Sequence, residues 1–599
     1  MIAGVSGAAF LLIFLAFGRS LFQGFAPLDD DLLITMNLAI RGMSLEHLKT
    51  VFTTYDPELY IPLTFVSYQL DYMIGGLDPW IYHLTNLLLH MGNTMLVMWV
   101  IFLLIRTCTG EAMPHLSIIA GLIFAVHPLN TETVVWLAAR KDLLSTFFFL
   151  AAWMAYLHYR GMWSRHRFVS TAYWLSVILF ILALLSKVMA ITLPAILILT
   201  DILIERRKWN GKMFMDKVPF VILSGIFLMV AAAGKERIIA NHSMWETSLM
   251  AAKSTVFYLQ KFLLPIHLGV FYPYRGDISL MLPAFFVPVL LLSCVFLLFF
   301  FLRHDRWVVF GALFFLLTLV PTFINFHKGG EMYFASDRYP YLPMIGLVFV
   351  VAMLQRTMLR PDNRAWEWIA GTGIIIVFMI MSFFQTKIWD SPVTLFGNTL
   401  RLYPESVAAR DALASMARQT GRYEYAIKLL RDGLAYGDNL QLRMGLGTVY
   451  AKVGRVDDAA DQFTHAMKLE PANPEPLVAL GVLDEYHKVF SSAMEKYRKA
   501  VELDPSYVSA RNKLGVLLLE AGQIDAAEEQ FRAALEWNPN AEGVLYNLSL
   551  VLDARGRPDE ALELLEKAHA LSPDDLRIAK ALQEHQARER SDPHDRHGQ

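Results

Sequence analysis

Long apolar stretches dominate the first two thirds of the chain. With a window of about 19 residues, the length that crosses a bilayer as a helix, about eleven such stretches stand out. We expect spans near residues 2–22, 80–105, 116–136, 143–160, 170–186, 188–204, 217–234, 280–302, 307–324, 339–356 and 366–386. From Trp389 onward, charged and apolar positions alternate as in a water-soluble helical protein. The pattern therefore predicts a polytopic membrane domain over 1–388, followed by a different domain.

The second domain is built from a sequence repeat of 34 residues. Leu446-Gly447 recurs as Leu480-Gly481 and Leu514-Gly515, with Ala at a fixed later position and Pro closing each unit. This spacing is typical of tetratricopeptide repeats, in which small residues let two helices cross. Within 389–588 we expect units at about 406–439, 440–473, 474–507, 508–541 and 542–575. Stacked helix pairs form an α-solenoid with a concave surface for a protein partner. The polar tail 589–599 is predicted to be disordered, and the fold class is all-α.

Composition supports the membrane assignment and excludes several classes of protein. Of 599 residues, 55% are hydrophobic and 18% charged, and the mean hydropathy is +0.39. A net charge of −2 gives no reason to expect nucleic-acid binding. The two cysteines, Cys108 and Cys294, lie in or beside apolar stretches, which argues against a disulfide framework and a thiolate metal site. We predict no metal site. The apolar start lacks a basic leading region, so we expect it to remain as an uncleaved helix.

Lysine and arginine set the expected orientation. With the N-terminus inside, most basic loops fall on the cytoplasmic side, and the segment 23–79 becomes an acidic outer loop. An odd number of spans then places the repeats on the outer side. We expect the spans to lie in the inner membrane of a bacterium, with the repeats in the periplasm, because Arg596-His597-Gly598-Gln599 is not a retrieval signal for internal membranes. Five basic residues remain at outer span ends, where they are disfavoured, and we expect some of them to bind an anion. They are Arg140, Lys141, Lys187, Lys328 and Arg338.

Three consecutive carboxylates, Asp29-Asp30-Asp31, follow the first span directly. Crowded carboxylates raise the pKa of at least one member, and such a group is suited to act as a general base. The alternative is a solvated helix start, because Asp is common at helix N-termini.

Polar residues inside the spans form further candidate sites. His83, Asn86 and His90 lie on one helix face, which suits hydrogen bonding between helices better than metal binding. His127-Pro128 breaks the third span, and Glu132, Trp136 and Arg140 then fall at i, i+4 and i+8. The stripe predicts either a buried ion pair at a helix corner or an arginine aimed at a phosphate. Lys187 lies in the predicted turn between two spans. Asp337-Arg338 is followed by two tyrosines and two prolines, a composition that suits the rigid rim of a pocket.

These segments together resemble a known family. LDDDLLITMN, HLTNLLLH, AVHPLNTETVVWLAARKDLLS, LLSKVMAITLPAILILTDIL and SDRYPYLP, followed by the repeats, are similar to the transmembrane and tetratricopeptide-repeat O-mannosyltransferases. The resemblance implies a GT-C fold and an inverting transfer of sugar from a polyprenyl-phosphate carrier to Ser or Thr hydroxyls of proteins. It also implies an acidic pair in the first outer loop, matched here by Asp29 and Asp30. Asp31 is an additional acid that leaves open which carboxylate acts.

The resemblance and the residue patterns lead to one principal hypothesis. Asp29 or Asp30 supplies the base, and the lipid-linked sugar is the donor substrate rather than a bound cofactor. We expect substrate binding by His83, His127, Glu132, Arg140, Lys141, Lys187, Asp337 and Arg338. The repeats would bind the acceptor protein. The main alternative is a non-enzymatic membrane scaffold whose repeats recruit envelope or pilus proteins. A transporter is disfavoured, because no acid lies mid-span.

Overall fold

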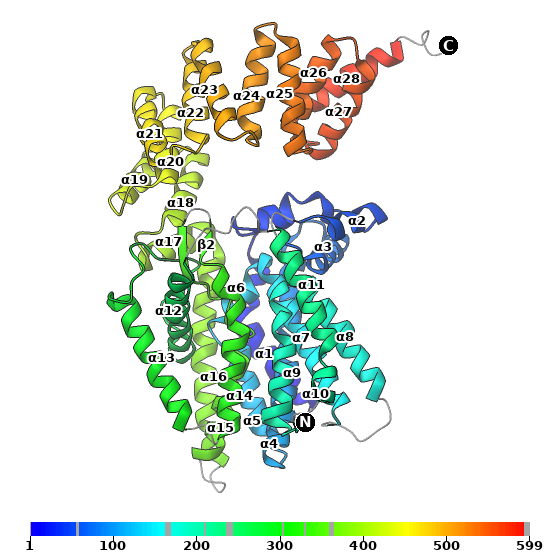
Figure 1. Ribbon diagram of the computed structural model, residues 1–599, viewed down its shortest axis with the longest axis vertical. Helices are drawn as coiled ribbons and strands as arrows, with labels where there is room; N and C mark the ends of the chain where they lie inside the picture. Colours follow the sequence, from blue (N-terminus) through cyan, green and yellow to red (C-terminus); the bar gives the residue numbers. More distant parts are fainter. Residues whose placement is uncertain are drawn as a thin grey trace. The chain divides into compact units, whose positions relative to one another are not determined.

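The computed structural model describes residues 2–55, 59–161, 169–208, 211–234, 243–301, 305–328, 331–358 and 364–591. The chain divides into two compact units, Met1–Ser406 and Val407–Gln599. Each unit consists mainly of α-helices (Figure 1), as the sequence predicts. The boundary between the two predicted domains, at residues 388/389, remains a prediction.

The first unit is a bundle of helices with short irregular elements at its ends. Its α-helices are α1 (Ile2–Phe17), α2 (Leu45–Thr53), α3 (Pro62–Gly75), α4 (Pro79–Thr109), α5 (Pro114–Val126), α6 (Asn130–Val135), α7 (Arg140–Tyr159), α8 (Val169–Ser186), α9 (Leu193–Leu199), α10 (Gly211–Met215), α11 (Val218–Gly234), α12 (Met244–Leu263), α13 (Pro283–Phe301), α14 (Arg306–Leu319), α15 (Met344–Met358), α16 (Arg364–Lys387) and α17 (Pro392–Leu402). Three further segments matter below: the π-helical turns η2 (Asp31–Thr35) and η6 (Thr200–Ile204), and the 3-10 turn η4 (Leu137–Ala139).

Four helical segments are long and apolar enough to cross a membrane. They are Pro79–Thr109, Met213–Gly234, Arg306–Ile324 and Trp368–Asp390, and six shorter apolar helices accompany them in the described residues. The count of about eleven spans therefore remains a prediction. One reason for short helices is proline. The predicted span 116–136 ends early because His127 precedes Pro128 and is extended (φ −68°, ψ 130°), a conformation that proline favours in the residue before it.

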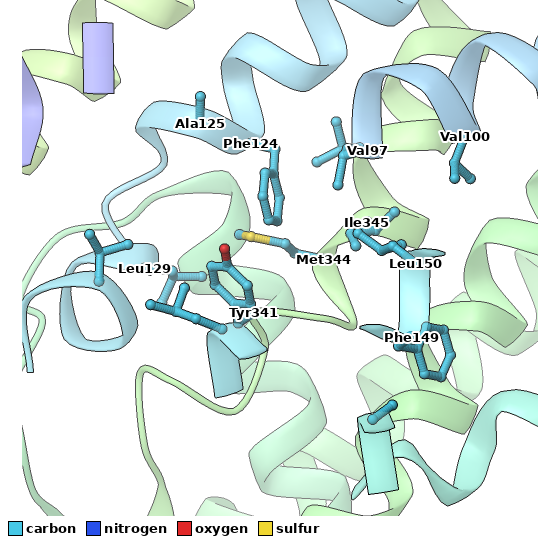
Figure 2. Close-up of a cluster of buried hydrophobic side chains, with 14 of the residues drawn as sticks. Val97, Val100, Phe124, Ala125, Leu129, Phe149, Leu150, Tyr341, Met344 and Ile345 are labelled. Atoms are coloured by element: carbon cyan, nitrogen blue, oxygen red, sulfur yellow. The ribbon is translucent and has the colours of Figure 1, made fainter. Parts of the chain in front are cut away.

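The core of this unit joins residues that are far apart in the sequence. Figure 2 shows Phe124 of α5, Tyr341, and Met344 of α15 close to Val97 of α4 and Leu150 of α7. These side chains are almost completely buried. Their packing fixes α4, α5, α7 and α15 as one body, from whose ends the polar loops project.

A three-stranded antiparallel sheet departs from the all-α pattern. Its strands β1 (Tyr272–Pro273), β3 (Glu331–Ala335) and β2 (His327–Lys328) lie in the order β1-β3-β2. Tyr272 is completely buried and pairs with Ala335. The sheet places the next three residues, Ser336 to Arg338, at the candidate site.

The second unit is a stack of helix pairs that follows the predicted repeat. Its helices are α18 (Val407–Gln419), α19 (Tyr423–Leu434), α20 (Leu440–Lys452), α21 (Val456–Leu469), α22 (Glu475–Tyr486), α23 (Phe490–Leu503), α24 (Val508–Glu520), α25 (Ile524–Trp537), α26 (Glu542–Ala554), α27 (Pro558–Leu571) and α28 (Leu576–Ser591). The repeated alanines, such as Ala493 and Ala527, are completely buried where the helices cross. α28 runs three residues into the predicted disordered tail, and residues 592–599 lie outside the described part.

Candidate functional site

Asp30 is a buried link between two loops. Its side chain is 1% exposed; Oδ2 accepts a hydrogen bond from the backbone N–H of Ala26, and Oδ1 accepts one from Ala138 in η4, both at 2.8 Å. Burial raises the pKa of Asp30 to about 7, against the two backbone donors, while Asp29 and Asp31 add smaller contributions. The expected raised pKa is present, but burial causes it more than crowding. Asp30 thus holds the acidic loop against η4.

Asp29 lies beside Asp30 in a more accessible position. Its side chain is half-buried, and its charge acts on both Lys141 and Arg338. Asp31 begins η2, where it accepts a hydrogen bond from the hydroxyl of Thr35 at 3.3 Å. Of the three neighbouring carboxylates, Asp29 is therefore the one placed opposite two of the predicted cations.

Two cations lie against the ring of Trp136. The guanidinium carbon of Arg338 lies 4.6 Å and the Lys141 ammonium 5.9 Å from the ring centre. Burial lowers the pKa of Lys141 to about 8, and the charge of Asp29 opposes this shift. Lys187 completes the cluster, because its charge also acts on Lys141. We call Lys141, Lys187 and Arg338 the cation cluster.

Carboxylates hold two members of the cation cluster in place. Arg338 donates to Oε1 of Glu132 at 2.7 Å, and Lys187 donates to Oδ1 of Asp142 at 2.5 Å. The hydroxyl of Ser336 also donates to Oε1 of Glu132, at 2.9 Å. The predicted residues Lys141, Lys187, Glu132 and Arg338 thus come together with Asp29. The side chain of Lys328 lies outside the described part of the chain.

Next to the cluster is a small, narrow pocket. Glu132, Asp337, Gln385, Trp389 and Asn398 contribute to its lining. Oε2 of Glu132 is buried and has no hydrogen-bond partner among the described residues. Asp337 accepts a hydrogen bond from the hydroxyl of Tyr272 at 2.6 Å, and burial raises its pKa well above the usual range. Carboxylate, amide and indole groups together are suited to contact a polyhydroxylated ligand.

Arg140 lies apart from this cluster. It is completely buried, donates to Oδ1 of Asn86 at 2.8 Å and to the carbonyl of Tyr82 at 2.6 Å, and forms an ion pair with Asp71. The predicted single stripe of Glu132, Trp136 and Arg140 is wrong, because the helix ends at Val135 and α7 begins only at Arg140. Glu132 pairs with Arg338 instead. Arg140 connects α3, α4 and α7.

The histidines are also enclosed. His90 hydrogen-bonds to the Tyr341 hydroxyl at 2.7 Å, and His127 bonds to the Phe262 carbonyl at 3.0 Å and stacks on that ring. His83 is 2% exposed and lies near the backbone of Gln23 and Gly24. These positions suit packing between helices, which is the role that the sequence favoured for His83 and His90. The contacts of His127 are with Phe262 and not with the cation cluster.

Two residues of this region were not singled out from the sequence. Asp71 could have been noticed as an acid within the apolar pattern of Pro62–Gly75, since a buried acid needs a partner. Trp389 carries no local signal, because its role comes from stacking on Trp136 at 6.4 Å across the fold. In the described parts of the chain, no group of three or more His, Cys, Asp or Glu residues is arranged to hold a metal ion.

Comparison with known proteins supports the resemblance. The human protein O-mannosyl-transferase TMTC3 is 24% identical over 453 residues, covering 69% of this chain and 48% of the relative. Protein O-mannosyl-transferase Tmtc1 of Drosophila melanogaster is 40% identical over 28% of this chain and 18% of its own. The chain thus spans about half the length of the first of these relatives. It is similar to transmembrane and tetratricopeptide-repeat O-mannosyltransferases, as the sequence motifs indicated.

The repeat region has its own matches. A family model described as tetratricopeptide repeat matches residues 412–474 and 512–575, and a TPR repeat model matches 490–522. Among solved structures, YrrB, a TPR protein with an unusual peptide-binding site, is 24% identical, covers 31% of this chain and 97% of its own, and has a TM-score of 0.23. A thermophilic TPR protein of Thermus thermophilus is 20% identical, covers 30% of this chain and 100% of its own, and has a TM-score of 0.27. The two family models confirm that tetratricopeptide repeats are present, and the bounds of the individual units remain a prediction.

Proposed function

We propose that this chain is a membrane glycosyltransferase of the GT-C type that modifies proteins. It would transfer a sugar from a polyprenyl-phosphate carrier to Ser or Thr hydroxyls on the periplasmic side of a bacterial inner membrane. One observation carries the proposal: the half-buried Asp29 lies opposite Lys141 and Arg338, which supports a base beside a site for an anion. The similarity to protein O-mannosyl-transferases supports the same reaction class.

Asp29 is the base in this scheme, and Asp30 positions it. Asp30 is 1% exposed, whereas the half-buried Asp29 is accessible enough to meet a hydroxyl. Asp29 takes the proton as the acceptor oxygen attacks the sugar C1, which is worth about 10²–10⁴-fold in rate for a general base. The bond from C1 to the carrier phosphate breaks on the opposite face, so the configuration at C1 inverts.

The cation cluster stabilises the leaving group. The carrier phosphate departs with the bonding electron pair, and its growing negative charge is met by Lys141, Lys187 and Arg338. Arg338 is suited to two-point contact with phosphate oxygens, while the lysines act as point charges. Glu132 contributes to the neighbouring pocket, and its Oε2, which has no partner among the described residues, would accept a hydrogen bond from a sugar hydroxyl at the pocket mouth, with Trp389 as an apolar surface for the ring.

Purified chain, a synthetic polyprenyl-phosphate mannose and a Ser/Thr-rich peptide provide the test. We expect glycosylated peptide with inverted configuration at C1, measured by mass spectrometry and NMR. Asp29→Asn should reduce the rate at least a hundredfold, and Asp31→Asn, a matched neighbouring carboxylate, should reduce it much less. Equal rates for Asp29→Asn and unmodified protein would refute the role of Asp29. No transfer of any offered sugar by folded protein would favour the membrane scaffold instead.

A further inference from the structure

The opposite end of the first unit contains a second group of charges, remote from the acidic loop. α4 contacts both η6 and α15, and α4 and α15 reach the end of the bundle away from α2 and α3 (Figure 1). Arg106 is in the last turn of α4, Arg206 follows η6, and Arg356 is in the last turn of α15. Segments separated by 100 residues or more in sequence thus bring three guanidinium groups to one region.

Neighbouring cations at this end are neutralised by acids. Arg160 pairs with Glu205 at 2.9 Å, Arg207 pairs with Asp216 at 2.7 Å, and Lys217 pairs with Asp201. Three cations therefore meet three carboxylates, and this network needs no external ion.

The three arginines differ from this network. Among the residues that the structure describes, none of Arg106, Arg206 and Arg356 has an acidic partner. Arg106 and Arg206 are exposed, and Arg356 is half-buried. The charges of Arg206 and Arg356 both act on the thiol of Cys108 in the last turn of α4, which places them around a common point. A cation at a helix C-terminus is favourable by itself, but that effect does not require three helices to converge.

The backbone conformation at Arg206 lets its side chain and that of Arg207 lie in different environments. Arg206 has φ of 57°, a conformation that costs a residue with a side chain roughly 1–2 kcal/mol relative to the right-handed region. Arg207 points inward, with 16% side-chain exposure and bonds to Asp201 and Asp216. The unusual φ allows Arg206 to remain exposed while the next arginine is half-buried and paired with acids. Strain of this kind persists where the surroundings or a ligand compensate for it.

We propose that Arg106, Arg206 and Arg356 form a binding site for the phosphate headgroup of an anionic phospholipid. A guanidinium group can bind two phosphate oxygens at once through parallel hydrogen bonds. Basic residues between helix ends at the cytoplasmic surface attract anionic lipids. The apolar helices beside the three arginines supply a surface for the acyl chains, whereas a free phosphate ion would gain only the polar contacts. This site is independent of the transfer reaction.

Native mass spectrometry and thermal unfolding of the full chain in neutral detergent test this site. Phosphatidylglycerol should stay bound and raise the Tm, whereas phosphatidylcholine should do neither. The triple variant R106Q/R206Q/R356Q should bind phosphatidylglycerol at least tenfold more weakly. The variant K49Q/K452Q/K468Q removes the same charge elsewhere and should bind like the unmodified protein. Equal binding of both lipids, or equal loss in both triple variants, would overturn the proposal, and so would full protection by inorganic phosphate alone.

Arg206→Gly provides a second test that does not depend on folding of the triple variant. Glycine adopts positive φ without strain, so the Tm without lipid should rise or stay equal. Binding of phosphatidylglycerol should nevertheless weaken severalfold, because the cation is lost. A purely structural role for Arg206 predicts no selective loss of lipid binding. Unchanged phosphatidylglycerol binding in Arg206→Gly would therefore contradict the site.

Discussion

Replacing Asp30 by Asn tests whether the burial of this carboxyl makes the stability of the fold depend on pH. Asp30 is almost completely buried, and its two oxygens bind the backbone N–H groups of Ala26 and Ala138. Asn keeps the shape but offers a single acceptor oxygen and cannot ionise. At pH 4, where the native carboxyl is protonated, we expect Asp30→Asn to cost about 1 kcal/mol for the altered hydrogen bond.

The difference in stability between the native protein and Asp30→Asn should change sign with pH. The folded pKa of Asp30 is about 7 and its ordinary value 3.8. A raised carboxyl pKa stabilises the fold fully below pH 3.8, and this contribution is lost as pH rises through 7. At 1.36 kcal/mol per pKa unit, about 4 kcal/mol is lost between pH 4 and pH 8. Asn avoids this loss, so Asp30→Asn should be less stable than the native protein at pH 4 and more stable at pH 8.

Tryptophan fluorescence during thermal unfolding in detergent, at pH values from 4 to 8, measures this effect. The Tm of the native protein should fall over this range more steeply than that of Asp30→Asn, and the two curves should cross. Asp31→Asn is the matched control and should keep the native slope. Parallel curves for the native protein and Asp30→Asn would refute the argument that burial of Asp30 sets its pKa.

Three further predictions concern cations and backbone strain. Lys141 has a pKa of about 8, so activity should fall above pH 8 as the cluster loses charge, and Lys141→Arg should move this alkaline decline to higher pH in rate profiles. Arg140→Lys should destabilise the protein by about 3–5 kcal/mol in chemical unfolding, because Lys cannot replace its buried contacts with Asp71 and Asn86. Lys488 has φ of 60°, so Lys488→Gly should stabilise the repeat unit by about 1 kcal/mol, measured by thermal unfolding; a loss of stability would contradict this.

The repeats were predictable because their packing rule is local. Every unit needs small residues at a fixed distance from a Pro, so a period of 34 residues appears directly in the sequence. At the turn between helices, most units have Gly at positive φ, as at Gly454 and Gly522, but Lys488 occupies the equivalent position in one unit. The sequence predicts the helix pair there, and the structure adds the strained turn.

The candidate site in the first unit was predictable only in part, since its contacts are non-local. Hydropathy and charge locate Asp29, Lys141 and Arg338 at span ends, and the structure brings them together. The partner of Asp30, the N–H of Ala138, is 108 residues away, and the partner of Glu132, Arg338, is 206 residues away. A helix spacing rule instead paired Glu132 with Arg140, because it assumed an unbroken helix through Trp136.

Glycoproteomics of a deletion strain tests the central claim most directly. The strain would be complemented with the native chain, Asp29→Asn or Asp31→Asn at equal membrane expression, and O-glycosylation of envelope proteins would be quantified by mass spectrometry. We expect the native chain and Asp31→Asn to restore a set of Ser/Thr glycans that Asp29→Asn does not restore. Full restoration by Asp29→Asn, or identical glycans with and without the chain, would contradict the account.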